Sequence, residues 1–218
     1  MMNYQLADHI HFCLSNGQVT FLDLRADRYF AVPQGTDLAF QRLVNGDPIS
    51  DCDAGALAPL LSTGVLQPAR SNVPLRLPPS ISPGERTIIP TGFKGSEIRA
   101  SALASQVETA LRLRLHPLSG TITRLQNRKH KAHRPPQSNI AEKAMAFLAI
   151  RRVISTQDHC LNWSIALIDY LAKGGHYPTL VVGVRRKPFA AHAWVQADDL
   201  LLNDIPDRVA RYSPILAV

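Results

Sequence analysis

Six prolines between Pro68 and Pro90 divide the chain into two parts. Proline fixes its own backbone angle φ and lacks the N–H that helices and central strands require, so such a stretch forms neither. The residues on each side must therefore bury their apolar side chains separately. We predict a domain over residues 1–70, a linker over residues 71–95 and a second domain over residues 96–218.

The composition is that of a globular protein. Hydrophobic residues make up 45% of the 218 residues, but no apolar run approaches the roughly 20 residues that a membrane-spanning helix needs. The N-terminal stretch MMNYQLADHIHF lacks the basic and then apolar order of a secretory signal. We therefore predict a cytoplasmic protein without a membrane partner.

The three cysteines are Cys13, Cys52 and Cys160, an odd number of widely spaced thiols. This spacing is not typical of a disulfide framework and fits a reducing compartment. The chain has no CxxC or HxxxH pair, so we predict neither a metal site nor a cofactor. Most buried cysteines only pack in a core, so the surroundings of each thiol decide whether it is reactive.

The first domain is predicted to contain three short strands followed by helices. Apolar residues alternate over residues 10–14, 19–24 and 28–32, which is the period of a strand. The period then changes to that of short helices over residues 38–43 and 54–61.

The second domain is predicted to begin with a helix over residues 96–115, followed by a basic loop over 124–137 and a helix over 140–154. The apolar positions of the first helix include Leu103, Val107, Leu111 and Leu115. Residues 99–134 carry eight basic residues against Glu108, and their net charge of +7 equals that of the whole chain. Such a segment suits an acidic peptide, a partner protein or nucleic acid, and a solvated helix face with a basic loop is the alternative.

Cys160 opens the apolar run CLNWSIALIDYLAKGG, whose spacing predicts a helix that ends at Gly174-Gly175. The thiol would lie in the first turn, where free N–H groups and the positive end of the helix dipole favour a thiolate. Neither Cys13, in a predicted strand, nor Cys52, in a polar loop, has this setting. We therefore predict that Cys160 is the reactive thiol.

Two strands over residues 192–196 and 200–204 flank Ala197-Asp198-Asp199, which predicts a hairpin. With a three-residue loop, His192 lies directly opposite Asp204, with both side chains on one face of the sheet. A two-residue loop would instead place Ile205 opposite His192. An imidazole beside a thiol keeps it ionised, and a carboxylate orients the imidazole, as nucleophilic amide cleavage requires.

The run from Cys160 to Asp204 resembles the leader peptidases of lasso-peptide biosynthesis, called B proteins. The matching residues are Cys160-Leu161, Ser164, Ala166-Leu167, Val182-Gly183-Val184, Pro188-Phe189, His192-Ala193-Trp194-Val195 and Asn203-Asp204. The resemblance implies an α+β protein whose second domain is a transglutaminase-like, papain-type cysteine peptidase with Cys160, His192 and Asp204 as catalytic residues. The chain departs from the family at Gln196, often Glu, and at Asp198-Asp199, where a glycine turn is common.

The segment TFLDLRADRYFAVPQGT looks like the peptide-recognition element of these pathways, a small winged-helix-like module similar to the chaperone for pyrroloquinoline quinone synthesis. In that family the leader of the precursor adds a strand to the third strand of the module. The resemblance assigns leader binding to Arg28, Tyr29, Phe30, Ala31 and Val32. Main-chain hydrogen bonds would supply the affinity and side-chain pockets the selectivity.

The resemblance implies that the protein binds a lasso precursor by its leader and hydrolyses the leader–core bond. A separate ATP-dependent cyclase, the expected partner, would then use the freed core amine. One alternative is an acyltransferase of transglutaminase type that also uses Cys160. A second is a winged-helix nucleic-acid-binding protein, but residues 35–61 contain only Arg42 as a base, so no nucleic-acid partner is expected. A third is a scaffold without catalytic activity.

Overall fold

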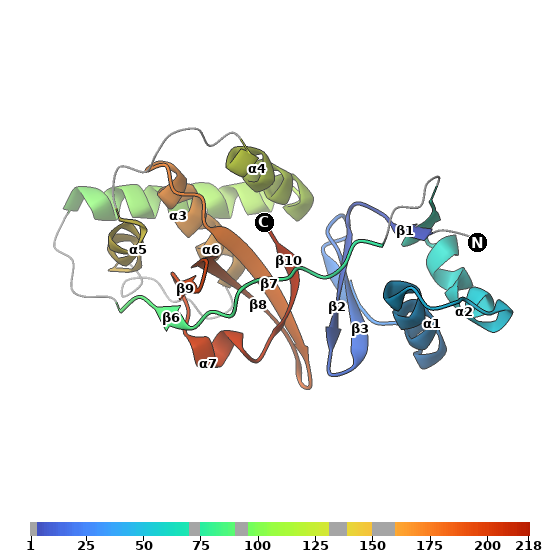
Figure 1. Cartoon of the computed structure of the whole chain (residues 1–218). Helices are drawn as coiled ribbons and strands as arrows, with labels where there is room; N and C mark the ends of the chain where they lie inside the picture. Colours follow the sequence, from blue (N-terminus) through green and yellow to red (C-terminus); the bar gives the residue numbers. More distant parts are fainter. Residues whose placement is uncertain (1–3, 70–74, 90–95, 131–138, 150–159) are drawn as a thin grey trace. The chain divides into compact units, whose positions relative to one another are not determined.

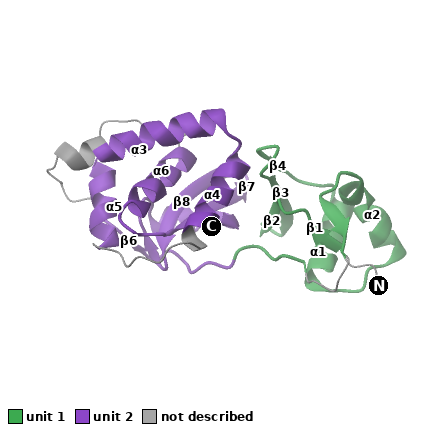
Figure 2. Cartoon of the chain, turned by 90° about the horizontal axis from the view of Figure 1, so that it is seen from above, with its two compact units in different colours: residues 1–79 green, residues 80–218 purple. Residues whose placement is uncertain are grey.

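A computed structural model describes residues 4–69, 75–89, 96–130, 139–149 and 160–218 (Figure 1). The chain forms two compact units, Met1–Pro79 and Ser80–Val218, which Figure 2 colours green and purple. Among the helices of the described residues, none is long and apolar enough to cross a membrane.

The first unit contains a three-stranded antiparallel sheet in the order β2 (Ile10–Ser15), β3 (Gln18–Asp23) and β4 (Arg28–Phe30). Helices α1 (Gln34–Asn45) and α2 (Asp51–Ser62) follow, so the prediction of strands followed by helices is confirmed. A further pair of strands, β1 (Tyr4–Leu6) and β5 (Leu66–Pro68), joins the two ends of the unit and was not predicted. The winged-helix assignment stays a prediction.

Turn and cap residues explain where these elements begin and end. Asn16 and Gly17 both have positive φ, as the two-residue hairpin between β2 and β3 requires. Helix α1 ends at Gly46, which takes the left-handed conformation with φ of 78°. Ser50 and Asp53 form a reciprocal capping box at the start of α2.

An aromatic cluster holds the sheet of the first unit against α1. The Phe40 ring on α1 lies 5.0 Å from both Phe12 and Phe21, and the Phe30 ring of β4 stacks on Phe21 at 5.0 Å between centroids. Burial of rings of this size contributes roughly 1.5–3 kcal/mol each to folding. The strand β4 is thereby fixed to the core through the side chain of Phe30.

The second unit is built on a five-stranded sheet whose described strands run in the order β10 (Ser213–Ala217), β7 (Thr179–Arg186), β8 (Phe189–Ala197), β9 (Leu200–Leu201) and β6 (Arg86–Thr87). Its helices are α3 (Ser96–Leu115), α4 (Leu118–His130), α5 (Ile140–Leu148), α6 (Cys160–Ala172) and the short α7 (Pro206–Val209). Helix α6 packs against both β8 and α3 (Figure 1). The predicted helix over 140–154 is described only as far as residue 149.

The segment predicted as a linker, residues 71–95, is not a linker along its whole length. Arg86 and Thr87 form β6, which pairs in parallel with β9, and the second unit begins at Ser80. The proline-based prediction failed here because Pro83 precedes the strand and Pro90 follows it, which leaves the intervening N–H groups free to pair.

The basic loop predicted over residues 124–137 is wrong for its first half, because α4 extends through His130. Residues 131–137 lie outside the described residues. The helix is held by three apolar side chains at helical spacing, Leu118, Ile122 and Leu125, all buried. Two of these residues precede Arg124. The loop was predicted from the basic charge after that position, so the helical spacing of the apolar residues was missed.

Helix α3 has the predicted bounds, but it buries the face opposite to the predicted one. The predicted apolar stripe is exposed: Leu103 38%, Val107 68%, Leu111 57% and Leu115 67%. The side that packs inward carries small and polar residues, namely Ala102, Ser105, Gln106 and Thr109, all at least 90% buried. Apolar periodicity alone therefore assigned the wrong face, because this helix packs against α6 partly through polar contacts.

Candidate active site

Cys160 is the first residue of α6, as predicted from the sequence. Every residue from Trp163 to Leu171 is buried, which makes α6 the central helix of the second unit. The backbone N–H groups of a first helical turn have no partner within the helix, so they are available to an anion near the sulfur. Cys13 is buried in β2 and Cys52 is exposed on α2, so among the three thiols only Cys160 is half-buried at the start of a central helix.

His192 lies on β8 opposite Gly183 of β7. The rings of Trp194 and Tyr212 flank its imidazole, with centroids 6.1 Å and 5.1 Å away. A Cβ atom on Gly183 would lie 2.9 Å from ring carbon Cζ3 of Trp194 and 2.9 Å from Cβ of Tyr212. Glycine at this position therefore lets the two aromatic residues approach the strand and enclose the imidazole, whose side chain is 13% exposed.

The predicted register of the hairpin after His192 is wrong. The loop between β8 and β9 has two residues, Asp198 and Asp199, and Gln196 pairs with Leu201 rather than with Leu200. Asp198 adopts a φ of 53°, a conformation that aspartate tolerates better than most residues, so no glycine is needed for the tight turn. Continued in this register, the ladder would set Ile205 opposite His192.

Asp204 nevertheless reaches His192, because β9 ends before it. The N–H of Leu202 still donates to the carbonyl of Val195 at 2.8 Å. In the other direction the N–H of Val195 donates to the side-chain Oδ1 of Asn203 at 2.8 Å, in place of a main-chain carbonyl. The chain leaves the ladder at Asn203, and the next carboxylate turns toward the imidazole.

Asn203 also connects this turn to helix α6. Its Nδ2 donates to Oγ of Ser164 on α6 at 2.9 Å, and Ser164 donates in turn to the carbonyl of Ala193 on β8 at 3.0 Å. Ser164 is fully buried. Both residues belong to the sequence pattern that carries the resemblance, but only the coordinates reveal that they link helix, strand and turn.

The imidazole of His192 bridges the other two residues. Its Nε2 contacts Oδ2 of Asp204, so Nδ1 is the nitrogen left for the hydrogen bond with the sulfur of Cys160. The second oxygen of Asp204, Oδ1, accepts the N–H of Ile205 at 2.8 Å and lies 3.5 Å from the guanidinium of Arg208. The structure thus brings together the thiol, imidazole and carboxylate that were predicted from the sequence.

Burial and hydrogen bonding act in opposite directions on the thiol and the imidazole. Burial alone would raise the pKa of Cys160, but the hydrogen bond with His192 and backbone hydrogen bonds of Ala193 and Leu161 outweigh it and lower that pKa. Burial alone would lower the pKa of His192, but hydrogen bonds with Asp204 and Cys160 raise it to about 9. Between the two pKa values the pair can hold a thiolate and an imidazolium, a nucleophile beside a proton donor.

A cavity of about 430 Å³ adjoins the aromatic residues that enclose His192. Its lining combines Trp194 and Tyr212 with residues 81–85, α7 and the start of β10. This volume is within the range of sites that accommodate small ligands or peptide side chains. Within the described residues, no group of three or more histidine, cysteine or acidic side chains could hold a metal ion.

The residues assigned to leader binding lie at and just after β4. Arg28, Tyr29 and Phe30 form the strand, and Ala31 and Val32 follow it. The side chain of Phe30 packs into the core, with the Arg28 guanidinium 5.7 Å from its ring centroid, whereas Ala31 is exposed. In the described part of the first unit, β4 pairs with β3 on one side only, which makes it an edge strand.

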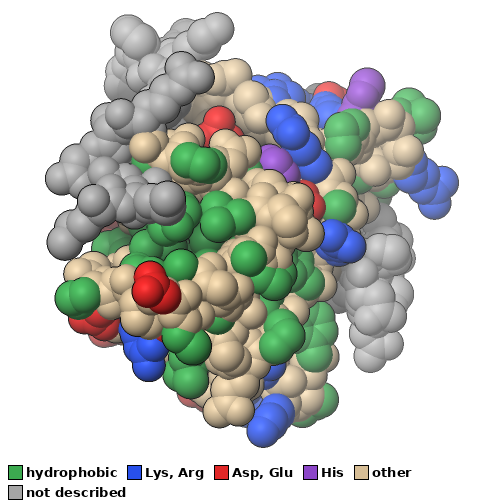
Figure 3. Space-filling model, turned by 90° about the vertical axis from the view of Figure 1, so that its right-hand side faces the viewer, with side chains coloured by type: hydrophobic (Ala, Val, Ile, Leu, Met, Phe, Trp, Pro, Cys, Tyr) green, Lys and Arg blue, Asp and Glu red, His purple; other side chains and the backbone are tan. Residues whose placement is uncertain are grey.

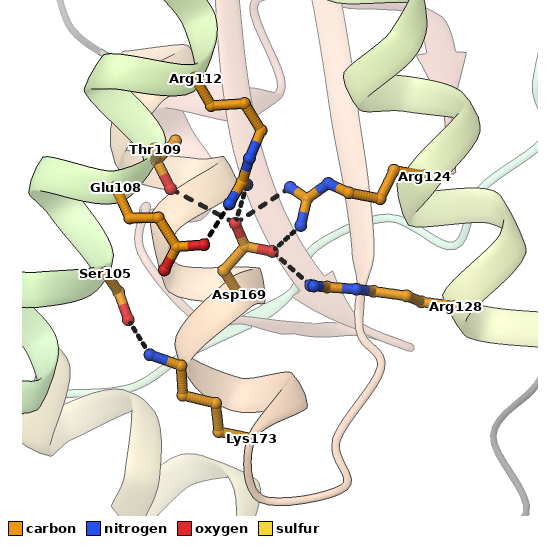
Figure 4. Close-up of polar contacts among 8 residues, drawn as sticks. All are labelled: Ser105, Glu108, Thr109, Arg112, Arg124, Arg128, Asp169 and Lys173. Atoms are coloured by element: carbon orange, nitrogen blue, oxygen red, sulfur yellow. Dashed lines mark hydrogen bonds and ion pairs between the residues drawn. The ribbon is translucent and has the colours of Figure 1, made fainter.

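Three arginines of the basic segment bind a single buried carboxylate on α6 (Figure 4). Asp169 is 6% exposed in its side chain and accepts from Arg112 at 2.8 Å, Arg124 at 2.9 Å and Arg128 at 2.7 Å. Thr109 of α3 also donates to Asp169 at 3.4 Å. Three of the eight basic residues of the segment therefore attach α3 and α4 to the helix that carries Cys160, so the segment is not only a solvated basic face.

Comparison with known proteins gives two matches. Residues 103–217 match the model of the transglutaminase-like superfamily. A stretch of 59 residues is 36% identical to the microcin J25-processing protein McjB of Escherichia coli, and it covers 27% of this chain and 28% of McjB. The chain thus matches well under two thirds of McjB. No solved structure matches significantly. Both matches support the resemblance to the B proteins of lasso-peptide biosynthesis.

Proposed function

Because this chain belongs to the transglutaminase-like superfamily, we propose that it is a cysteine peptidase that binds the leader of a lasso-peptide precursor and hydrolyses the leader–core bond. The observation that carries the proposal is the contact of His192 with both Cys160 and Asp204 at the start of α6. The similarity to a protein named for microcin processing supports the choice of substrate class.

The geometry suits amide hydrolysis through an acyl-enzyme. The Cys160 thiolate attacks the scissile carbonyl carbon, and backbone N–H groups at the start of α6 stabilise the negative charge that develops on its oxygen. The His192 imidazolium then gives its proton to the departing amine of the core, which leaves the leader as a thioester on Cys160. His192 next takes a proton from water, whose oxygen attacks the thioester and releases the leader with a free carboxylate. Asp204 keeps the imidazole oriented throughout.

The freed core amine is the chemical group that a macrolactam-forming cyclase needs, so a separate ATP-dependent cyclase is the proposed partner. A winged-helix nucleic-acid-binding role has little support. Arg42, the one base between residues 35 and 61, forms an ion pair with Asp53 on α2 and is thus occupied within the unit.

Hydrolysis and acyl transfer share the acyl-enzyme, so the reaction products must separate them. We expect purified protein, incubated in oxygen-18-labelled water with a synthetic lasso precursor peptide, to yield two peptides. The leader should end in a carboxylate that contains one heavy oxygen atom, as mass spectrometry would reveal. A leader joined to an added amine, without the heavy oxygen, would identify an acyltransferase instead. A precursor that remains intact would count against both the peptidase and the acyltransferase activity.

We further propose that the leader adds a strand alongside β4, the edge strand of the order β2-β3-β4. Ala31 is an exposed residue just past the last one paired with β3, which supports this site. Helix α1 begins three residues later and exposes Leu38 to 47%, which offers an apolar contact to the same peptide. Hydrophobic side chains are visible among the charged ones on the face of the molecule in Figure 3.

Replacing Ala31 by proline should raise the Kd for a fluorescently labelled leader peptide by about tenfold, because proline removes the main-chain N–H that residue 31 would donate to the added strand. Fluorescence anisotropy with the full-length protein measures this. Ala31→Val is the matched control, since it keeps the N–H and should bind like the wild type. Equal affinities for the proline and valine variants would show that the leader does not pair at this position.

A further inference from the structure

The chain segment that leads out of the first unit is bound closely to the β8–β9 hairpin, which Asp204 follows in the chain. The N–H groups of Glu85 and Arg86 both donate to the carbonyl of Asp199, at 3.0 and 3.1 Å. The Arg86 side chain makes two further bonds to the Asp199 carboxylate, at 2.7 and 2.9 Å, and the N–H of Ile88 donates to the carbonyl of Leu201 at 3.2 Å. These contacts place Thr87 beside the end of β9.

Close packing accompanies the hydrogen bonds. A Cβ atom on Gly84 would lie 2.4 Å from Cδ2 of Leu201, whose side chain is fully buried. Gln196, also buried, donates to the carbonyl of Ser82 at 3.0 Å. Residues 82–88 are therefore integrated into the second unit over their whole length.

Thr87 is the member of this segment that reaches the candidate catalytic residues. Its Oγ1 donates to the main-chain carbonyl of Asp204 at 2.6 Å, while the carbonyl of Ile88 lies farther away at 3.5 Å. Since β9 ends at Leu201, no regular ladder holds the backbone of Asp204. The Thr87 hydroxyl provides a fixed point there, and the carboxylate oxygens are left to contact His192 and the N–H of Ile205.

We propose that Thr87 is a positioning residue of the peptidase, which holds the backbone of Asp204 so that its carboxylate meets the imidazole of His192. The inference rests on the proposed function for its catalytic meaning. It extends that function by making the segment between the recognition and peptidase parts a component of the catalytic apparatus. Thr87 acts through Asp204 and contacts neither the sulfur nor the imidazole in any described bond.

The charged and titratable groups around His192 and Asp204 determine how a displaced Asp204 would change the protonation of His192 and Cys160. Cys160 and Asp204 contact His192 directly, Tyr212 lies against its ring, Arg208 of α7 lies 3.5 Å from Asp204, and Arg185 lies over Tyr212. Both arginines disfavour a nearby imidazolium, whereas Asp204 and the sulfur of Cys160 stabilise it. A poorly placed Asp204 should leave less imidazolium and hence less thiolate.

The test compares Thr87→Val, which removes the hydroxyl at nearly constant shape, with Thr87→Ser, which keeps it. In Thr87→Val we expect kcat for the precursor to fall about tenfold, the loss that one hydrogen bond of ordinary strength represents, with KM unchanged. Thr87→Ser should restore most of kcat. Thr123→Val, which removes an exposed hydroxyl on α4, controls for the loss of a threonine hydroxyl elsewhere.

Alkylation of Cys160 by iodoacetamide gives a second readout that needs no substrate. Peptide mass spectrometry resolves Cys160 from Cys13 and Cys52, and the ratio of its alkylation rates at about pH 6 and about pH 10 reports the thiolate held by the imidazolium. This ratio should fall about tenfold in Thr87→Val and remain at the wild-type value in Thr87→Ser and Thr123→Val.

The two readouts separate the two proposals. A wild-type alkylation ratio in Thr87→Val would overturn the positioning role of Thr87, whatever the enzyme cleaves. A lowered ratio in a protein that leaves the precursor intact would support the role of Thr87 and reject the peptidase. Equal losses in the valine and serine variants would also overturn the proposal, because they would point to packing rather than to the hydroxyl.

Discussion

Replacing Cys160 by alanine is expected to slow cleavage of the precursor by about 10⁴-fold or more, while the affinity for the leader stays unchanged. The substitution removes the atom that forms the acyl-enzyme, and neither His192 nor Asp204 can take its place. Leader binding is assigned to the first unit, which has its own core around Phe12, Phe21 and Phe40. Product formation measured by mass spectrometry and leader affinity measured by anisotropy on the same preparation test both parts.

Cys52→Ala is the matched control for this experiment, because Cys52 is an exposed thiol on α2 of the first unit. This variant should cleave the precursor at the wild-type rate. Substantial cleavage by Cys160→Ala would assign the chemistry to another nucleophile and reject the mechanism proposed above. A loss of leader binding in Cys160→Ala would instead contradict the proposal that the first unit binds the leader and the second unit cleaves the precursor.

Replacing Asp169 by asparagine is expected to destabilise the second unit by about 3–5 kcal/mol, the usual cost of leaving buried charges without their partner. Asparagine has nearly the same shape, but it cannot neutralise Arg112, Arg124 and Arg128, which converge on this one carboxylate. Both tryptophans, Trp163 and Trp194, lie in the second unit. Tryptophan fluorescence during urea unfolding of the full chain therefore reports on that unit.

Glu108→Gln provides the comparison, since Glu108 pairs with the same Arg112 but is 57% exposed. Its loss should cost less than about 1 kcal/mol, as exposed ion pairs generally do. If Asp169→Asn and Glu108→Gln unfold at the same urea concentration, the arginine cluster does not hold α3 and α4 on α6.

The same cluster gives the stability a defined pH dependence. Burial alone would raise the pKa of Asp169, but hydrogen bonds from Arg124 and Arg112 outweigh it and lower that pKa. An aspartate whose pKa is lowered in the folded state stabilises the fold at pH values above about 4, the pKa of an unfolded aspartate. This contribution is lost as the pH falls through the lower pKa of the folded state.

Local sequence patterns predicted the elements that bear the candidate site. The start of α6 at Cys160 followed from an apolar run with helical spacing, and the strand around His192 followed from the hairpin signal at Ala197-Asp198-Asp199. The register after His192 did not follow, because a loop of two residues and a loop of three are equally compatible with Ala197-Asp198-Asp199. Asp204 was nonetheless identified, partly through the resemblance and partly through a three-residue-loop register that is wrong. In the structure, Asp204 reaches His192 because the chain leaves the ladder at Asn203.

Contacts between distant residues account for most of what the sequence did not predict. The arginines that bind Asp169 lie 57, 45 and 41 residues away from it in the chain, and nothing local pairs them with that carboxylate. The orientation of α3 depends on the same contacts, since its polar side chains face α6. Thr87 likewise lies 117 residues from Asp204.

The place of β6 has a practical consequence for dividing this protein into separate polypeptides. A cut at the end of the proline-rich stretch, ahead of residue 96, would give the strand Arg86–Thr87 to the N-terminal fragment and leave β9 as an unpaired edge in the C-terminal one. Exposed sheet edges promote aggregation. A gene split ahead of residue 80 would keep all five strands in the fragment that contains Cys160. That position is therefore the better boundary for producing the two units separately.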